Sequence, residues 1–329
     1  MSEPLTSVLV PCHNSERWIS QTIKSALAQE GARVEVIAVD DGSTDNTLQE
    51  LRRFDPKIQV ITTPNRGASA ARNTAYRAAQ GEFIQYLDAD DLLAPGKIAA
   101  QLALARDDDR LLTFGSIIHF DDGSPLETGT RFTATLREEL HTPTEFLIDL
   151  LGGNGQGWMV QTGQWLIPRQ IAEQAGPWNE TLSVDDDGEY FCRVVLAARE
   201  IAPCPKSVSY YRKFSNGRNL SAQFAATRVG AASQLASTRL KSQHLGRATT
   251  DSRAAAAFAK QYAGIAVQCY PQAALVSAEA EAEVRKLGCS LCPPKGTPSF
   301  NTFSRILGWK LARRMQHLAG HMRSTFVRK

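Results

Sequence analysis

Four short apolar runs alternate with helical stretches over the first quarter of the chain, and this alternation limits the chain to few folds. The runs are too short for helices, whereas the segments between them repeat apolar residues at helical spacing. The runs are Ser7–Val10, Val34–Val39, Ile58–Thr62 and Phe83–Leu87. Strands that alternate with helices form parallel sheets with helices on both faces. The sequence therefore predicts an α/β fold with a doubly wound, mostly parallel sheet.

A polar or turn-forming cluster follows each of these predicted strands. The clusters occupy residues 11–14, 40–43, 64–67 and 88–91. The carboxyl ends of parallel strands lie at one edge of the sheet, and ligands bind at that edge. We therefore expect the four clusters to surround one crevice, and this convergence is the main argument from the sequence for a site.

Three carboxylates lie within four positions after the last of these strands, at Asp88, Asp90 and Asp91. Carboxylates at this density repel one another and are costly to bury unless a cation joins them. Side chains alternate along an extended segment, so Asp88 and Asp90 point the same way. Such a pair suits Mg²⁺ or Mn²⁺, with a bound diphosphate supplying further oxygen ligands. The alternative is a solvated acidic turn before the next helix.

The sequence lacks two common nucleotide-binding motifs. No GxGxxG follows the first predicted strand, which disfavours a dinucleotide fold, and no GxxxxGK[ST] is present, which disfavours a P-loop. A phosphatase of the haloacid-dehalogenase type carries its acidic pair after the first strand, whereas here the pair follows the fourth. What remains is a nucleotide site in which the first two strand ends hold base and ribose, and Asp88 and Asp90 hold a metal on a diphosphate.

Composition and charge fit a globular protein without a nucleic-acid partner. The 329 residues are 43% hydrophobic and 22% charged, and the net charge of +3 is too small to indicate nucleic acid. The six cysteines are scattered, apart from the Cys289–Cys292 pair, and predict free thiols. The N-terminus lacks the basic residues of a signal peptide, and no apolar run is long enough to span a membrane. We therefore expect a cytoplasmic protein.

The residues of the four clusters resemble those of the family 2 glycosyltransferases. The matching segments are Val8–Asn14, Val36–Ser43 with Asp45 and Thr47, Asn65–Gly67 with Ala71–Asn73, and Tyr86–Asp91. Each segment alone is weak evidence for the family, but together they follow the family's order and approximate spacing. The similarity covers roughly residues 5 to 215. The resemblance implies the GT-A fold, a nucleotide-sugar donor, a divalent metal (Mn²⁺ or Mg²⁺) and inversion at the anomeric carbon.

The resemblance implies donor-binding roles for residues at the strand ends. Asp41 would hydrogen-bond the uracil or other base, and Pro11 and His13 would line the base pocket. Asp88 would contact the ribose or the metal, and Asp90 would ligate the metal directly. The expected donor-binding set is Pro11, His13, Asp40, Asp41, Gly67, Asp88, Ala89 and Asp90. The alternatives are an Asx turn or helix cap for Asp40 and packing within a turn for His13.

An acidic run at residues 185–187 opens a predicted helix. A helix N-terminus favours negative charge, which explains the run without any function. The run also resembles the family's ED-type motif, in which the second acid is the general base. Counting back from Arg193 makes Asp187 the base and leaves Asp186 as the alternative. Glu189 then falls on the acceptor side.

The family's closing segment adds an expected diphosphate ligand, Arg212. Many family members carry a His directly after this Arg, whereas Lys213 stands here. If that His assists metal or diphosphate binding, then Arg212, Lys213 or Arg218 must replace it. By contrast, Arg72 and Asn73 are expected to support the fold rather than to bind a ligand.

We expect two regions in the chain. Residues 1–220 form the GT-A domain, with a donor half at about 1–120 and an acceptor half at about 121–220. Trp165, in the acceptor half, is a candidate for stacking on a sugar, and the alternative is core packing. Residues 221–329 form a helical C-terminal region.

The end of the helical region is predicted to be a basic amphipathic helix at about residues 300–327. Apolar residues there are interleaved with bases, and no Asp or Glu occurs after Phe300. Such a helix docks on a membrane surface, or it packs on the catalytic domain or a dimer partner with a solvated basic face. The first alternative would place the protein peripherally on the inner face of the membrane.

The sequence thus predicts an inverting, metal-assisted glycosyltransferase. It would move a sugar from a nucleotide-diphosphate donor, a UDP-sugar by the resemblance, to a hydroxyl of a glycan or lipid-linked acceptor. One alternative is a nucleotide-sugar-binding protein without turnover. Another is a metal-dependent nucleotidyltransferase, which would release pyrophosphate instead of a nucleoside diphosphate.

Overall fold

One sheet of nine strands forms the centre of the computed structural model, which describes residues 3–105, 107–132, 139–214 and 227–326. The strand order is β3-β2-β1-β4-β8-β6-β9-β5, and β7 pairs with β6. The strands are β1 (Leu5–Cys12), β2 (Arg33–Asp41), β3 (Gln59–Thr63), β4 (Phe83–Tyr86), β5 (Leu92–Leu93), β6 (Leu111–Asp121), β7 (Thr130–Phe132), β8 (Trp165–Pro168) and β9 (Glu200–Lys213).

The four strands predicted from the sequence are the parallel half of the sheet. β1 pairs in parallel with β2 and β4, and β2 pairs in parallel with β3. β8 then runs antiparallel to both β4 and β6, and β6 is again parallel to β9. The predicted α/β fold with a doubly wound, mostly parallel sheet is confirmed.

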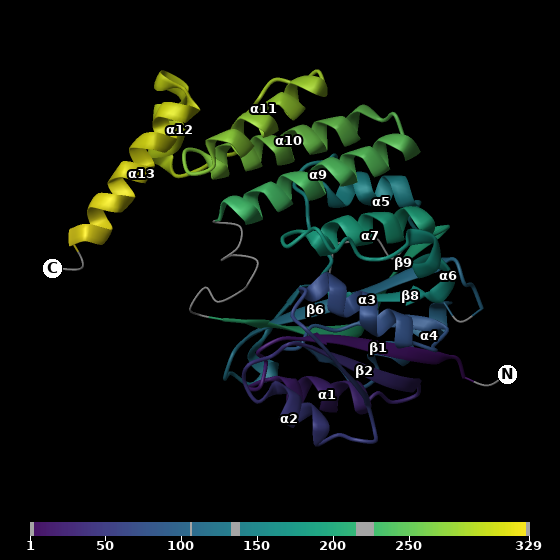
Figure 1. The fold of residues 1–329 in the computed structure, drawn as a ribbon. Coiled ribbons are helices and arrows are strands. Elements are labelled where there is room, and N and C mark those ends of the chain that lie inside the picture. The colour runs from purple at the N-terminus through teal and green to yellow at the C-terminus, as the bar shows by residue number, and fades with distance from the viewer. Residues whose placement is uncertain (1–2, 106, 133–138, 215–226, 327–329) are drawn as a thin grey trace.

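Helices cover both faces of the sheet (Figure 1). Those of the first half are α1 (Ile19–Leu27), α2 (Thr47–Arg52), α3 (Ala68–Ala78) and α4 (Lys97–Ala105). Those of the second half are α5 (Pro143–Leu150), α6 (Arg169–Ala175) and α7 (Asp186–Ala197). The C-terminal region contains α9 (Arg228–Ala248), α10 (Ser252–Cys269), α11 (Ala274–Lys286), α12 (Pro298–Leu307) and α13 (Trp309–Phe326).

Alternate residues of β1 and β2 face two separate hydrophobic clusters. Val8 and Val36 belong to the cluster beneath α1 and α4, whereas Leu9 and Ile37 belong to the cluster that contains α5 and α7. All four side chains are at most 2% exposed. Burial on both faces explains why these strands are almost wholly apolar rather than alternating.

β9 is longer than the sequence indicates. The sequence alone predicts a strand at Val208–Arg212, which is only the second half of β9, and Pro203 and Pro205 disfavour a strand before it. The structure accommodates the prolines with a register shift opposite Gly115, where pairing of β6 passes from Cys204 to Val208. The whole strand spans Glu200–Lys213.

The helical C-terminal region shares a core with the second half of the sheet domain. Leu235 of α9 and Phe258 of α10 belong to the same cluster as Tyr190 of α7. Figure 1 shows α9, α10 and α11 stacked beyond α5 and α7, on the side of the sheet away from α1 and α2. The predicted boundary at residue 220 lies outside the described residues.

The basic segment at about residues 300–327 is not one helix. Gly308, with φ 79°, separates α12 from α13 and allows the chain to change direction there. The expected single amphipathic helix is therefore wrong in form, although both helices keep the apolar and basic pattern. In the part of the chain that the structure describes, no helix has the length and apolar character needed to cross a bilayer. All six cysteines are free, as predicted.

Candidate active site

The four polar clusters meet at the carboxyl edge of the parallel strands, as the sequence predicts. After β1 and β2, the Asn14 backbone N–H donates to Ser43 Oγ over 3.0 Å. After β2 and β3, the Arg66 backbone N–H donates to the Asp41 carboxylate over 3.0 Å. These bonds join neighbouring strand ends into one rim, and α3 connects the rim to the acidic segment after β4.

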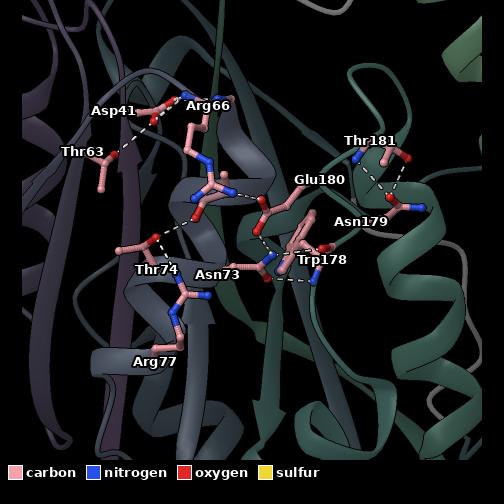
Figure 2. Close-up of polar contacts among 12 residues, drawn as sticks. Asp41, Thr63, Arg66, Asn73, Thr74, Arg77, Trp178, Asn179, Glu180 and Thr181 are labelled. Atoms are coloured by element: carbon pink, nitrogen blue, oxygen red, sulfur yellow. Dashed lines mark hydrogen bonds and ion pairs between the residues drawn. The ribbon is translucent and has the colours of Figure 1, made fainter.

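Asp41 holds the loop between β3 and α3. Its carboxylate is 3% exposed and accepts hydrogen bonds from Thr63 Oγ1 (3.1 Å), Arg66 N (3.0 Å) and Gly67 N (2.7 Å). Figure 2 shows the carboxylate beside Thr63 and Arg66. Both carboxylate oxygens of Asp41 thus already accept hydrogen bonds from the protein. In the predicted contact, the nucleotide base would share these oxygens with the protein donors.

The other predicted nucleoside residues differ in accessibility. His13 is exposed, and its ring Nδ1 lies 2.9 Å from the Asp41 carbonyl oxygen, whereas Pro11 is buried. Asp40 Oδ1 accepts a 3.3 Å bond from Ser43 N, which is the turn role proposed as its alternative. Gly67 is exposed, with φ 92° at the start of α3, and no atom lies within 4 Å of where its Cβ would be. The surface above Gly67 is therefore open.

The acidic segment after β4 divides into exposed and buried carboxylates. Asp88 is one-third exposed, whereas Asp91 is 6% exposed and accepts a 2.9 Å bond from the Arg212 backbone N–H. Burial and the charge of Asp88 raise the pKa of Asp90 to about 6. Burial and the charges of Asp90 and Asp88 also raise the pKa of Asp91. Asp88 and Asp90 are thus the pair left for a ligand, and Asp91 belongs to the framework.

Arg72 of α3 joins the acidic segment to the start of α7. Its Nη2 donates to Asp88 Oδ1 over 2.8 Å and its Nη1 donates to Asp186 Oδ2 over 3.0 Å. The guanidinium lies 4.3 Å from the centre of the Trp178 ring, and the residue is 6% exposed. Burial alone would lower the pKa of Arg72, but the charges of Asp88 and Asp186 raise it above its usual range. Arg72 therefore remains a cation between the two predicted halves of the site.

Asn73, next to Arg72, attaches the 177–180 loop to α3. Its Nδ2 donates to Trp178 O and to Glu180 Oε1, each over 2.9 Å, and its Oδ1 accepts from Trp178 N over 2.8 Å. Arg66 pairs with Glu180 over 2.6 Å on the same side (Figure 2). This fold-supporting role for Asn73 is the one that the sequence predicts.

The start of α7 is held by four residues on one face of α9: Ser233, Ser237, Lys241 and His244. We call this face the α9 polar stripe. Ser233 Oγ accepts from the backbone N–H groups of residues 183 and 184, and His244 Nε2 lies 3.1 Å from Glu189 Oε1. Lys241 Nζ lies 2.5 Å from Asp185 Oδ2, and Ser237 Oγ donates to Asp185 O over 2.7 Å. The α9 polar stripe thus fixes the segment that carries the predicted base.

Asp185 needs this support because its backbone is strained. Its φ of 61° is a left-handed value that few non-glycine residues adopt. A side chain at Gly188 would place Cβ 2.1 Å from Asp185 Oδ1, so only glycine fits beside this carboxylate. The turn presents the two following carboxylates at the first turn of α7.

Asp186 and Asp187 have different surroundings. The Asp186 carboxylate accepts from both Arg72 Nη1 and Ser69 Oγ, the latter over 2.8 Å. Asp187 accepts a 2.8 Å bond from the backbone N–H of Gly188, and the structure gives it no ion pair among the described residues. Burial and the charges of Asp186 and Asp185 raise the pKa of Asp187 to about 6. Asp187 is therefore a carboxylate that can take up a proton near neutral pH.

Arg212 is not placed to bind a diphosphate. It is 4% exposed, and its guanidinium donates to Asp90 O (2.8 Å), Asp122 Oδ1 (3.2 Å) and Gln21 Oε1 (2.9 Å). The buried guanidinium instead fixes the backbone of Asp90, which corrects the predicted role. Lys213 is exposed, and Arg218 lies outside the described residues.

Two predicted acceptor residues are buried in the protein. The Trp165 ring is 1% exposed and stacks on Phe191 at 5.3 Å, so its predicted sugar-stacking role is wrong and the core-packing alternative holds. Glu189 is 2% exposed, and its carboxylate binds Arg193 over 2.8 Å as well as His244. With Arg193 and His244 it lines a cavity of about 620 Å³ between α3, α7 and α9. Its ion pairs argue against a direct contact with an acceptor hydroxyl.

The sequence does not predict some residues that shape the site, because their partners lie far away in sequence. The sequence predicts only a fold-supporting role for Arg72, because no residue near it in the sequence indicates a contact with Asp186. The α9 polar stripe lies beyond the recognised motifs, in an Ala-rich region. Its spacing was the available signal, because polar residues four, four and three positions apart share one face of a helix that otherwise packs on a core.

Asp88 and Asp90 could supply some, but not all, of the ligands of a divalent cation. Asp88 and Asp90 are hard oxygen donors, and burial together with the charge of Asp88 raises the pKa of Asp90, an effect that a bound cation would offset. Arg72 donates to Asp88 Oδ1, and no described residue is shown bonded to the second carboxylate oxygen of Asp88. Among the described residues, no group of three or more His, Cys, Asp or Glu side chains could hold a metal ion. The protein would thus supply two carboxylates, and phosphate and water the remaining ligands.

The fold and the acidic carboxyl edge define a GT-A-type architecture. The model of the glycosyl transferase family 2 matches residues 7–174, and the chain belongs to this family. A solved structure of TarS from S. aureus, residues 1–349 in complex with UDP-GlcNAc, has a TM-score of 0.59 and 17% identity. The match covers 88% of this chain and 93% of that one, and it shows the shared fold.

Two curated relatives each match about a third of the chain. The putative teichuronic acid biosynthesis glycosyltransferase TuaG of Bacillus subtilis is 37% identical over 130 residues, 38% of this chain and 52% of TuaG. WfgD of Escherichia coli is a UDP-Glc:alpha-D-GlcNAc-diphosphoundecaprenol beta-1,3-glucosyltransferase. It is 39% identical over 106 residues, 32% of this chain and 42% of WfgD. The chain spans about half the length of the curated relatives it matches.

Proposed function

We propose that the chain is an inverting glycosyltransferase that moves a sugar from a UDP-sugar to a hydroxyl of a glycan or lipid-linked acceptor. The observation that carries the proposal is the pair of acidic groups at one edge of the sheet, Asp88 with Asp90 and Asp186 with Asp187. Arg72 joins the two groups. Family membership and the names of the relatives support a sugar-nucleotide donor and a role in polysaccharide biosynthesis.

The donor nucleotide would lie over the ends of β1 and β2. His13 and the loop held by Asp41 would border the base, and the open surface above Gly67 leaves room for it. Asp88 and Asp90 would hold Mn²⁺ or Mg²⁺ together with the diphosphate. When bound, the metal supplies positive charge that stabilises the departing UDP. Arg212 contributes by fixing the Asp90 backbone rather than by touching phosphate.

Asp187 would act as the general base. Its carboxylate removes the proton of the acceptor hydroxyl as that oxygen forms a bond to the anomeric carbon. The bond between the anomeric carbon and the diphosphate oxygen breaks in the same displacement, and UDP leaves with the electron pair. The transition state is oxocarbenium-like, as in glycoside hydrolysis, and a single displacement inverts the configuration. Asp186 is less suited to this task, because Arg72 and Ser69 already engage its carboxylate.

The released product tests the proposal. The purified chain is incubated with a panel of nucleotide sugars, Mn²⁺ and a panel of saccharide and lipid-linked acceptors, and UDP and pyrophosphate are measured. We expect acceptor-dependent release of UDP. Release of pyrophosphate would indicate a nucleotidyltransferase, and tight UDP binding without release from any donor would indicate a binding protein.

A further inference from the structure

α12 and α13 expose a row of large apolar side chains, which we call the C-terminal apolar stripe. Its members are Phe303, Ile306, Leu307, Leu311, Met315 and Leu318. Ile306 is 71% exposed and Leu318 is 64% exposed. Other exposed large apolar residues of the described chain, such as Leu104 on α4 and Leu275 on α11, belong to other elements. Exposed large apolar side chains that concentrate on two consecutive helices indicate an interaction surface.

The opposite face of α13 attaches both helices to the protein. Ala312 is 1% exposed and clusters with Val267 of α10 and with Phe300 of α12. The Trp309 ring lies 5.6 Å from the ring of Tyr270. At 3.6 residues per turn, Leu311 and Leu318 fall on the side of α13 away from these contacts, and Met315 lies between the two sides. The stripe therefore faces outward, and Figure 1 shows α12 and α13 projecting beyond the ends of α10 and α11.

The charged residues of α12 and α13 are all basic. Arg305 and Arg314 are exposed, with the Arg314 guanidinium 5.4 Å from the Tyr270 ring, and the sequence contains no Asp or Glu after Glu283. Lys310 lies 2.7 Å from Glu281 but is still 49% exposed. Apolar side chains bordered by bases match a surface that offers both an apolar layer and negative charge.

We infer that the C-terminal apolar stripe docks this protein on an anionic membrane surface. The apolar side chains enter the boundary between headgroups and acyl chains, and the flanking bases contact lipid phosphates. A symmetric contact with a second copy is disfavoured, because a two-fold interface sets the same bases of the two copies against each other. The inference concerns a different surface from the active site and does not depend on the reaction.

Vesicle sedimentation of the full chain tests the inference. Vesicles of phosphatidylcholine with and without phosphatidylglycerol are compared, at low and high salt. We expect binding to the anionic vesicles that weakens as salt rises. The double variant Ile306→Gln, Leu311→Gln should weaken this binding at least about tenfold, because both side chains are exposed and belong to the stripe. Arg305→Gln with Arg314→Gln should weaken binding to anionic vesicles alone.

A matched variant separates the stripe from general surface hydrophobicity. Val229→Gln with Leu275→Gln removes two side chains that are 70% and 82% exposed but lie on α9 and α11. This control should bind vesicles like the unaltered chain. Absence of binding by the unaltered chain, or equal binding by the stripe variant, would overturn the inference. A third outcome would also overturn the inference. In it, the unaltered chain does not bind vesicles but forms a dimer in light scattering, and the stripe variant is a monomer.

Discussion

Asp88 and Asp186 bind opposite terminal nitrogens of one buried arginine, Arg72, although Asp88 follows β4 and Asp186 begins α7, far away in sequence. One residue is predicted to hold the donor's metal and the other to neighbour the base. The geometry of the two halves of the site is therefore coupled. Replacement of Arg72 should affect donor binding and transfer together.

Arg72→Met should be strongly destabilising. It leaves two carboxylates without their cation, and breaking a buried ion pair costs about 3–5 kcal/mol. We expect a loss of stability at the lower end of this range, because Asp88 is one-third exposed. Arg72→Lys should be only a partial rescue, since an ammonium cannot span both carboxylates as the planar guanidinium does. Urea unfolding measures the stability, with Arg77→Met, exposed on the same helix, as the control. A free energy of unfolding equal to that of the unaltered chain would contradict the bridge.

Transfer should decline in acid because the base must be deprotonated. The pKa of Asp187 is raised to about 6, so kcat should fall about tenfold per pH unit below pH 6 and be level above it as far as this group is concerned. The same shift lets the folded state bind the proton more tightly than the unfolded chain. The contribution of Asp187 to the free energy of unfolding therefore decreases as pH rises from about 4 to about 6. A kcat that stays constant down to pH 5 would exclude this assignment.

Lys241 should position the predicted base, Asp187, although it lies outside the residues that the family model matches. Lys241→Met leaves the charge of Asp185 without its cation, and this raises the pKa of Asp187 further. We expect the acid limb of the kcat profile to move to higher pH, with Lys241→Arg restoring it. Arg239 lies on the same helix as Lys241, and Arg239→Met, which removes an ion pair to Glu283 of α11, serves as the control. A loss of stability without movement of the acid limb would show that Lys241 is merely structural.

Asp90→Ala should weaken UDP binding only when metal is present. The variant removes one of the two carboxylates expected to hold the cation, so affinity in Mn²⁺ should fall at least about tenfold. In EDTA the variant and the unaltered chain should bind UDP equally. Titration calorimetry in the two buffers gives both values. Undiminished affinity in Mn²⁺ would remove Asp90 from the metal site.

The sequence was sufficient for the parts of the site that local pattern controls. Strand-helix alternation predicts the parallel half of the sheet, and strand order alone brings Asp41 and Asp88 to one edge. The roles of Trp165 and Arg212 depend on which residues bury them, and these come from distant elements such as Phe191 on α7 and Gln21 on α1. Local pattern contains no record of such contacts.

The same reason explains the strand and helix errors. β9 passes Pro203 and Pro205 because β6 tolerates a register shift opposite them, which only the pairing reveals. The break at Gly308 was readable in principle, since glycine commonly ends helices. The apolar and basic pattern runs across this glycine on both sides, and it therefore predicted one helix instead of two.

The comparison of Asp187→Asn with Asp186→Asn tests the central claim most directly. Both variants are assayed for acceptor-dependent UDP release and, by calorimetry, for UDP affinity in Mn²⁺. Loss of a general base costs about 10²- to 10⁴-fold in rate, so Asp187→Asn should lose transfer to this degree while its UDP affinity changes by less than about twofold. Asp186→Asn should keep measurable transfer but lose stability, because Arg72 loses a partner. Retained transfer in Asp187→Asn would contradict the account.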